Sequence, residues 1–315
     1  MSSGQTLVTG CGGFVGSWLV PALQEAGHEL IGLVRPGRGH ETPELDTLEV
    51  DLRDRAATHA ALRRTRPDRI VHLAALAAPT AATEQPLEAL RVNYIAVDHL
   101  LGALATHAPA ARLLYVGTSD VYGLQSAEAP PFREDASIRP ANLYAATKAA
   151  GERRAELASE REGLDVVRAR PFNHTGPGRP ASYVEAAFAR QIALIERGAS
   201  GPELRVGNLE PVRDFSDVRD VVRAYVLLLE RAKRGEVYNV CSGQGHRISE
   251  LLEHLLARSS ATPEVVVDPD RFRPTTPDRL AAVGDATRLR ELGWSPHYTF
   301  DQTLADVLED WRKRA

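Results

Sequence analysis

Short apolar runs alternate with longer amphipathic stretches throughout the first half of the chain. The apolar runs have the lengths of strands, and they cover residues 6–9, 29–34, 47–50, 69–74, 112–117 and 165–168. Between them, Ala and Leu recur at helical spacing, which predicts helices over residues 17–26, 87–106 and 142–162. Successive strand-helix-strand units form a parallel sheet covered by helices on both faces. The sequence therefore predicts an α/β fold on a Rossmann-like, doubly wound parallel sheet, with functional side chains just after the strands.

The pattern changes after Pro171, where glycine and proline punctuate shorter elements. A helix over Ser216–Arg231, capped by Ser216 or Asp217, and a strand over Val237–Cys241 then indicate a return to the main sheet. We therefore expect a large domain and a smaller, discontinuous C-terminal lobe. The large domain takes residues 1–170 and about 214–242, and the lobe takes residues 171–213 and 243–315.

Composition narrows the class of protein without identifying it. The chain has 315 residues, 43% hydrophobic and 25% charged, which are ordinary globular values. A net charge of −4 argues against a nucleic-acid surface, which neutralises phosphates with clustered Lys and Arg. Two cysteines, Cys11 and Cys241, form neither a disulfide framework nor a metal-ligand pattern. Since the N-terminus lacks leader features and no apolar run approaches ~20 residues, we expect a cytoplasmic protein with no metal, nucleic-acid or membrane partner.

A glycine-rich segment lies directly between the first predicted strand and the first predicted helix. It reads Thr9-Gly10-Cys11-Gly12-Gly13-Phe14-Val15-Gly16. Glycines at 10, 13 and 16 serve the turn, the approach of a pyrophosphate to the backbone and the packing of the helix, and the helix N-terminus favours negative charge. Such a segment alone also fits an ordinary turn, but its position predicts a dinucleotide site.

The second predicted strand ends in Leu33-Val34-Arg35, without the acidic residue that usually binds the adenosine ribose of NAD. Arginine suits the 2′-phosphate of NADP instead, so we expect NADP(H) to be preferred and NAD(H) to be possible. Asp51 and Leu52 follow the third strand and are expected to flank the adenine. Asp51 alternatively caps the next helix.

Tyr144 and Lys148 are four residues apart on a predicted helix and therefore share one face. A neighbouring ammonium favours a phenolate, so we expect Lys148 to lower the tyrosine pKa from about 10. Tyr144 would then exchange a proton with the substrate while a nicotinamide exchanges hydride.

Upstream, an apolar strand runs into Thr118, Ser119 and Asp120, and Thr118 is placed to hold the reacting oxygen. A Tyr/Lys pair or a hydroxyl at a strand end is commonplace alone, so the interpretation depends on their combination.

Together these motifs resemble the extended short-chain dehydrogenase/reductases, which act mostly on nucleotide sugars. The resemblance covers essentially the whole chain. It rests on Thr-Gly-x-x-Gly-Phe-x-Gly, on Thr-Ser-Asp-Val-Tyr-Gly at the strand end and on Tyr-x-x-x-Lys. It implies that Thr118 is the catalytic hydroxyl, that Tyr144 and Lys148 are the catalytic pair, and that Lys148 also binds the nicotinamide ribose. The large domain would then bind the dinucleotide and the lobe the nucleotide sugar, and we expect a homodimer.

Later segments are similar to those of GDP-4-keto-6-deoxy-D-mannose reductases. They are Arg170-Pro171-Phe172-Asn173-His174-Thr175-Gly176-Pro177-Gly178, Gly207–Phe215 and Glu236–Gly243. The resemblance places Asn173, Arg213 and Arg273 around the nucleotide diphosphate, where arginine forks pair with phosphate oxygens. Each arginine alone would more ordinarily be a surface ion pair.

Asp120 leaves a second reaction open. In the sister GDP-mannose 4,6-dehydratases a glutamate at this place moves the proton next to the keto group, and Asp120 is one methylene shorter. It is a vestige, a substrate ligand or a working acid/base.

The resemblance favours reduction of a GDP-4-keto-6-deoxyhexose, giving GDP-D-rhamnose or its 4-epimer. A 4,6-dehydratase and a nucleotide-sugar 4-epimerase are the alternatives, and neither consumes the cofactor. A dinucleotide sensor without catalysis is a remoter alternative, because such a protein need not retain Thr118, Tyr144 and Lys148.

Overall fold

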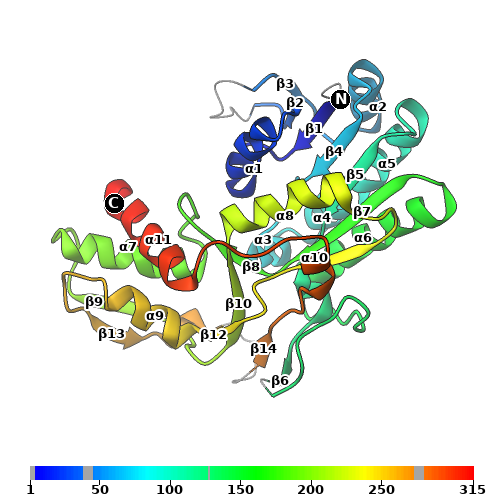
Figure 1. Cartoon of the computed structure of the whole chain (residues 1–315). Coiled ribbons are helices and arrows are strands. Elements are labelled where there is room, and N and C mark those ends of the chain that lie inside the picture. Colours follow the sequence, from blue (N-terminus) through cyan, green and yellow to red (C-terminus); the bar gives the residue numbers. More distant parts are fainter. Residues whose placement is uncertain (1–3, 38–44, 127, 273–279) are drawn as a thin grey trace.

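The computed structural model describes residues 4–37, 45–126, 128–272 and 280–315 (Figure 1). Its main element is a seven-stranded parallel sheet in the order β11-β7-β5-β4-β1-β2-β3. The strands are β1 (Gln5–Thr9), β2 (Glu29–Val34), β3 (Thr47–Glu49), β4 (Arg69–His72), β5 (Arg112–Val116), β7 (Asp165–Pro171) and β11 (Val237–Val240). The predicted Rossmann-like fold is confirmed, and the predicted strands match the observed ones apart from one to three residues at their ends.

Helices cover both faces of this sheet because alternate strand residues point to opposite sides. The helices are α1 (Phe14–Glu25), α2 (Arg55–Thr65), α5 (Ala96–His107), α6 (Leu143–Arg161) and α8 (Val218–Arg231). In β1, Val8 packs in the cluster that includes α1 and α8, whereas Leu7 packs in the one that includes α2, α5 and α6. Both residues are fully buried, so the sheet is the centre of the core.

The helices predicted over 17–26 and 142–162 match α1 and α6 to within three residues at their ends, whereas two other helix predictions need correction. The stretch predicted as one helix over 87–106 is α4 (Pro86–Leu90), a π-helical turn η1 (Arg91–Ile95) and α5. The N-cap of α8 is Asp217, the last residue of the preceding strand, and its carboxylate accepts the Arg219 amide at 2.8 Å; Ser216 lies one residue too early to cap the helix. Asp217 still has the extended backbone of an N-cap residue, so the helix begins at Val218.

The remaining elements lie beside the carboxyl ends of the main strands (Figure 1). A five-stranded sheet contains β6 (Gln125–Ser126), β8 (Asn173–Thr175), β10 (Val212–Asp217), β12 (Gly245–Arg247) and β14 (Leu280–Ala282). A two-stranded sheet pairs β9 (Glu203–Val206) with β13 (Glu264–Val267). The helices are α7 (Val184–Glu196), α9 (Ile248–Leu256) and α11 (Phe300–Arg314), which share a separate hydrophobic core.

Short elements connect these layers. They are α3 (Pro79–Glu84), the 3-10 turns η2 (Ser119–Tyr122) and η3 (Pro269–Arg271), and α10 (Thr287–Glu291). Within the described ranges, none of the helices is both long enough and apolar enough to span a bilayer. Both cysteines are buried and free, as the absence of a disulfide pattern predicted.

Candidate active site

The glycine-rich turn lies at the carboxyl end of β1, in the middle of the main sheet. Gly10 has a φ of 73°, and a Cβ on Gly16 would lie 2.3 Å from the Cys11 carbonyl oxygen, so both positions require glycine. Gly13 is the N-cap of α1 and has no side chain that could cap the helix. The backbone amides of the first turn, which includes Phe14 and Val15, therefore remain available to an anion. The local geometry is that of a dinucleotide loop.

The residues predicted beside the adenosine lie at the neighbouring strand ends. Arg35 is exposed directly after β2, and Leu52 is buried after β3. The carboxylate of Asp51 binds the Arg53 guanidinium at 2.6 and 2.9 Å, and this pairing lowers the pKa of Asp51. Asp51 does not cap α2, because Asp54 accepts the bond from the Ala57 amide. The capping alternative for Asp51 is therefore wrong.

The side chains of Thr118, Tyr144 and Lys148 converge just beyond the carboxyl end of β5. The Thr118 hydroxyl accepts the Asp120 amide at 3.2 Å and lies close enough to the Tyr144 phenol to act on its pKa. The Lys148 ammonium donates to the Val116 carbonyl at 2.7 Å. Tyr144 is 9% exposed and Lys148 3% exposed, so α6 presents both toward the sheet. Residues from two distant segments thus form one cluster.

The pKa of Tyr144 is raised, which is the opposite of the sequence-based expectation. Burial is the main cause, and the Asp120 carboxylate adds to it, while the Thr118 hydroxyl acts against both. Burial also lowers the pKa of Lys148 to about 8, opposed by the Glu152 carboxylate. Desolvation is thus the largest influence on both groups, and the expected lowering of the Tyr144 pKa by Lys148 is wrong. The phenol is therefore protonated at neutral pH, which is the form that donates a proton.

Asn93 is a site residue that sequence reasoning missed. It lies in the π-helical turn η1, and its side-chain amide donates to the Thr147 hydroxyl at 3.0 Å and accepts the Leu76 amide at 2.9 Å. Gly151 allows the close crossing, since a Cβ there would lie 2.3 Å from the Asn93 carbonyl oxygen. π-Turns are frequent at functional sites, but the periodicity gave no signal of this one. Asn93 ties the turn to the helix that carries Tyr144 and Lys148.

Arg179 is a second residue that the motifs did not indicate. Its guanidinium carbon lies 3.4 Å from the centre of the Tyr183 ring and 4.9 Å from that of Phe14. Its Nε donates to the Glu185 carboxylate at 3.3 Å. The loop after β8 thereby packs against the first turn of α1, and the Trp18 indole strengthens this contact by donating to a carbonyl of the same loop. This contact brings a segment of the predicted lobe against the dinucleotide loop.

The predicted diphosphate ligands differ in how far the structure describes them. Asn173 lies on β8, paired in register with Phe215 of β10. Arg213 lies on β10, and its guanidinium donates to the Val212 and Leu280 carbonyls at 2.8 and 3.0 Å. Arg273 lies outside the described residues. Asn173 and Arg213 therefore lie on the paired strands β8 and β10, and the bond to the Leu280 carbonyl directs the Arg213 side chain toward β14.

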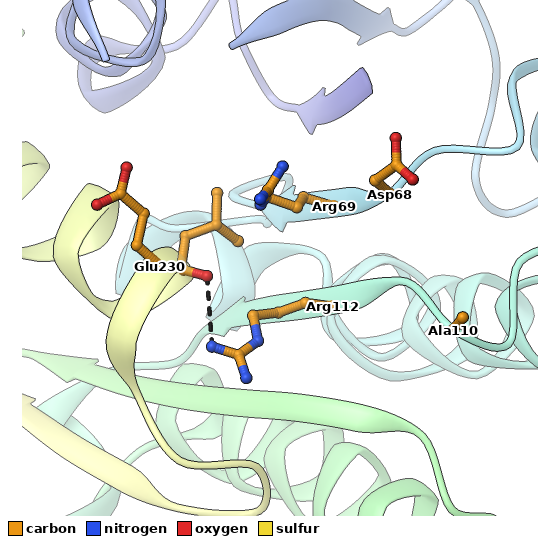
Figure 2. A pocket seen from close by; sticks show the side chains of 6 residues that line it. Asp68, Arg69, Ala110, Arg112 and Glu230 are labelled. Carbon is orange, nitrogen blue, oxygen red and sulfur yellow. Dashed lines mark hydrogen bonds between the residues drawn. The ribbon is translucent and has the colours of Figure 1, made fainter. Parts of the chain in front are cut away.

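A cavity of about 260 Å³ lies at the opposite end of the main sheet, between the first residues of β4 and β5 and the end of α8 (Figure 2). It is lined by Asp68, Arg69, Ala110, Arg112, Leu229 and Glu230. Arg112 is already bound to Asp165 at 2.9 Å and to the Leu229 carbonyl at 3.4 Å. Ligands of such sheets bind at the carboxyl ends of the strands, so this cavity is not the candidate site.

The fold and the converging side chains define a dinucleotide-dependent class of protein, and comparison with known proteins defines the family. Residues 7–307 match the model of the GDP-mannose 4,6 dehydratase family, and the chain belongs to this family, among the extended short-chain dehydrogenase/reductases. It is 37% identical over 308 residues to GDP-6-deoxy-D-mannose reductase of Pseudomonas aeruginosa, covering 98% of this chain and 97% of the relative.

Solved structures agree with this assignment. RMD from Pseudomonas aeruginosa, complexed with NADPH, has a TM-score of 0.87 and 36% identity, over 99% of this chain and 100% of that one. UDP-glucose 4-epimerase from Thermus thermophilus, in complex with NAD, has a TM-score of 0.88 and 29% identity over the same shares. The resemblance inferred from the motifs is confirmed.

Proposed function

We propose that this protein uses NADPH to reduce the 4-keto group of a GDP-4-keto-6-deoxyhexose. The mannose derivative is the preferred substrate, and the product is GDP-D-rhamnose or its 4-epimer. The observation that carries the proposal is the buried cluster of Thr118, Tyr144 and Lys148 in a chain 37% identical, over nearly its whole length, to a GDP-6-deoxy-D-mannose reductase.

The cluster supplies what a ketone reduction needs besides hydride, which NADPH provides when bound. Thr118 donates a hydrogen bond to the keto oxygen and orients the ketone. Tyr144, whose raised pKa keeps it protonated, gives its proton to the oxygen as negative charge develops there. Lys148 holds positive charge near the resulting phenolate and binds the nicotinamide ribose. Each role uses a group that is already in place before ligands bind.

The cofactor is assigned to NADP(H), with NAD(H) possible. Gly10, Gly13 and Gly16, with Phe14 and Val15, would hold the pyrophosphate at the start of α1. Arg35 would meet the 2′-phosphate, while Asp51 and Leu52 would flank the adenine. The similar structures support both cofactors, because one holds NADPH and the other NAD.

The substrate is assigned to the smaller lobe, over residues 171–213 and 243–315, with the dinucleotide on residues 1–170 and about 214–242. Asn173, Arg213 and Arg273 would bind the diphosphate. The sugar would then lie between this lobe and Tyr144. The contact of the loop after β8 with α1 supports this placement, because it brings the lobe against the dinucleotide loop.

A homodimer completes the proposal. Leu87 and Leu90 of α4 and Leu143 of α6 are large apolar side chains left exposed on two helices that contact each other. Exposed apolar patches of this kind mark protein interfaces. Sedimentation analysis of the wild type and of Leu87→Asp tests it: a dimer that becomes monomeric in the variant is expected, and a monomeric wild type contradicts it.

A 4,6-dehydratase is the second candidate, favoured by the Asp120 carboxylate beside Tyr144. Net consumption of NADPH separates the reactions, because a dehydratase or epimerase regenerates its cofactor. The protein would be incubated with NADPH and 4-keto-6-deoxy sugars on GDP, dTDP and UDP. We expect loss of absorbance at the reduced nicotinamide band with the GDP sugar. No consumption with any of them, together with conversion of GDP-mannose, would establish the dehydratase instead.

A further inference from the structure

A buried ion pair joins Arg170, the first residue of the segment 170–178, to Glu152, which lies in none of the motifs, and the sequence motifs assign a role to neither residue. Arg170 of β7 donates from Nε and Nη2 to Oε1 of Glu152 on α6, at 2.9 and 2.6 Å. Both side chains are only 6% exposed. Buried ion pairs contribute little net stability compared with apolar residues of similar size. Stability alone therefore does not explain why two charged side chains are buried here. The other contacts of Arg170 and Glu152 indicate a role in positioning the candidate site.

Arg170 is attached to the segment that carries Thr118 and Asp120. Its Nη1 donates to the Tyr122 hydroxyl at 2.7 Å, and its guanidinium lies 4.8 Å from the centre of the Tyr122 ring. The Tyr122 hydroxyl in turn donates to the Asn239 side chain at 2.7 Å. Tyr122 ends the 3-10 turn that begins after Thr118. Arg170 thus holds one end of the turn that presents the catalytic hydroxyl.

Glu152 is attached to both halves of the cluster. It lies four residues after Lys148 on α6, and its charge opposes the lowering of the Lys148 pKa by burial. A Cβ on Gly117 would lie 3.1 Å from Glu152 Oε2, so the carboxylate packs against the residue before Thr118. One buried carboxylate therefore contacts the strand end and lies one helical turn after Lys148 on the same face of α6.

Among the described residues, Glu152 is the charged group that opposes the effect of burial on the Lys148 pKa, and the other groups around the ammonium act differently. His72 of β4 faces it, but burial lowers the pKa of His72 to about 3, so this ring is neutral. Tyr115 of β5 lies beneath the ammonium, 5.0 Å from nitrogen to ring centre, and burial raises its pKa. On the far side, Arg168 lies 3.8 Å from Glu152 and pairs more closely with Glu156, at 2.6 Å.

We propose that Glu152 and Arg170 form a positioning pair, in which Arg170 fixes the carboxylate of Glu152 so that it keeps Lys148 charged and holds the Thr118 strand end. The inference rests on the proposed function for its catalytic consequence. Its electrostatic part concerns the free protein and is measurable without any substrate.

The composition of the chain makes a direct measurement possible. The sequence contains three lysines, Lys148, Lys233 and Lys313, and the last two are exposed. With ¹³C-labelled lysine, the Cε resonance of each reports its own ammonium titration, and the Lys148 signal is assigned by its absence from Lys148→Met. We expect a wild-type midpoint near the value of about 8 that the structure indicates. The two exposed lysines serve as internal references.

Glu152→Gln is the first test. Removing the carboxylate removes what opposes burial, so the Lys148 midpoint should fall by at least about one pH unit. Glu156→Gln, one turn further along α6, is the matched control and should leave the midpoint unchanged. In NADPH-dependent reduction, the alkaline limb of kcat/KM should move down with the midpoint in Glu152→Gln only.

A second variant keeps the test decisive where Glu152→Gln does not fold. Glu152→Leu with Arg170→Met replaces the pair by apolar residues, which folded proteins tolerate. Its Lys148 midpoint should also lie below that of the wild type. An unchanged midpoint in either folded variant, or an equal fall in Glu156→Gln, would overturn the proposal. Because the titration needs no substrate, a failed reductase assay with a shifted midpoint would contradict the proposed function alone.

Discussion

The two sides of the candidate site are built differently. On the main-sheet side, Thr118, Tyr144 and Lys148 are buried, and hydrogen bonds to the backbone hold the Thr118 hydroxyl and the Lys148 ammonium. On the opposite side, Arg213 is only partly buried, and its guanidinium is bonded to backbone carbonyls of its own sheet. The proposed catalytic side is organised by the core, whereas under the proposed function a bound diphosphate would have to draw the Arg213 guanidinium away from these carbonyls.

This difference has an energetic reason. Preorganised groups lower the cost of reaching the transition state, because they need not reorient during the reaction. A diphosphate brings two negative charges, and charge-assisted hydrogen bonds to it are strong enough to replace bonds to neutral carbonyls. Changes on the catalytic side should therefore affect turnover, and changes on the recognition side should affect substrate affinity.

The largest effect is expected from Tyr144→Phe, which removes the proton donor and keeps the ring. Turnover should fall roughly 10²–10⁴-fold, while NADPH binding stays nearly intact. Stopped-flow NADPH oxidation and a fluorescence titration with NADPH measure the two quantities. Lys148→Ala should damage both, because Lys148 is also assigned to the nicotinamide ribose. Wild-type turnover in Tyr144→Phe would show that another residue is the acid.

Arg213→Ala tests the recognition side. Losing a charge-assisted contact of about 1.5–3 kcal/mol should raise KM for the keto sugar roughly 10- to 100-fold, with kcat nearly unchanged. Steady-state kinetics at saturating NADPH separate the two constants, and Arg213→Lys should recover part of the affinity. A loss confined to kcat would place Arg213 on the catalytic side and contradict its assignment to substrate recognition.

Asp120→Asn separates reduction from dehydration, since it keeps the size of the side chain and removes the base. Under the proposed function, NADPH oxidation with the keto sugar should continue at a rate reduced about tenfold, as for a lost orienting contact. Wild-type protein should not convert GDP-mannose to the 4-keto-6-deoxy sugar. Efficient dehydration by the wild type that disappears in Asp120→Asn would reverse the assignment.

The smallest and most selective effect is expected from Arg35→Ala. NADPH binding should weaken by up to about tenfold, and NADH binding should stay nearly unchanged, because only NADPH carries the 2′-phosphate. Titrations of wild type and variant with both cofactors give the comparison. Equal weakening of both, or a wild-type preference for NADH, would remove the argument for NADP.

Features that depend on neighbours along the chain could be predicted from the sequence. The alternation of apolar runs and amphipathic stretches indicated the strands of the main sheet, and glycines 10, 13 and 16 indicated the turn after β1. The four-residue spacing placed Tyr144 and Lys148 on one face of α6. These succeed because strand and helix periodicity and the permitted φ of glycine are local properties of the backbone.

Only the tertiary structure decided the features that depend on burial and on contacts between distant segments. It split one predicted helix by the π-turn at Asn93, and it made Asp217 rather than Ser216 the cap of α8. It also paired Arg170 with Glu152, and it raised the pKa of Tyr144 where the neighbouring lysine predicted a fall. Desolvation is set by everything that packs around a group, and residue spacing along the chain does not contain that information.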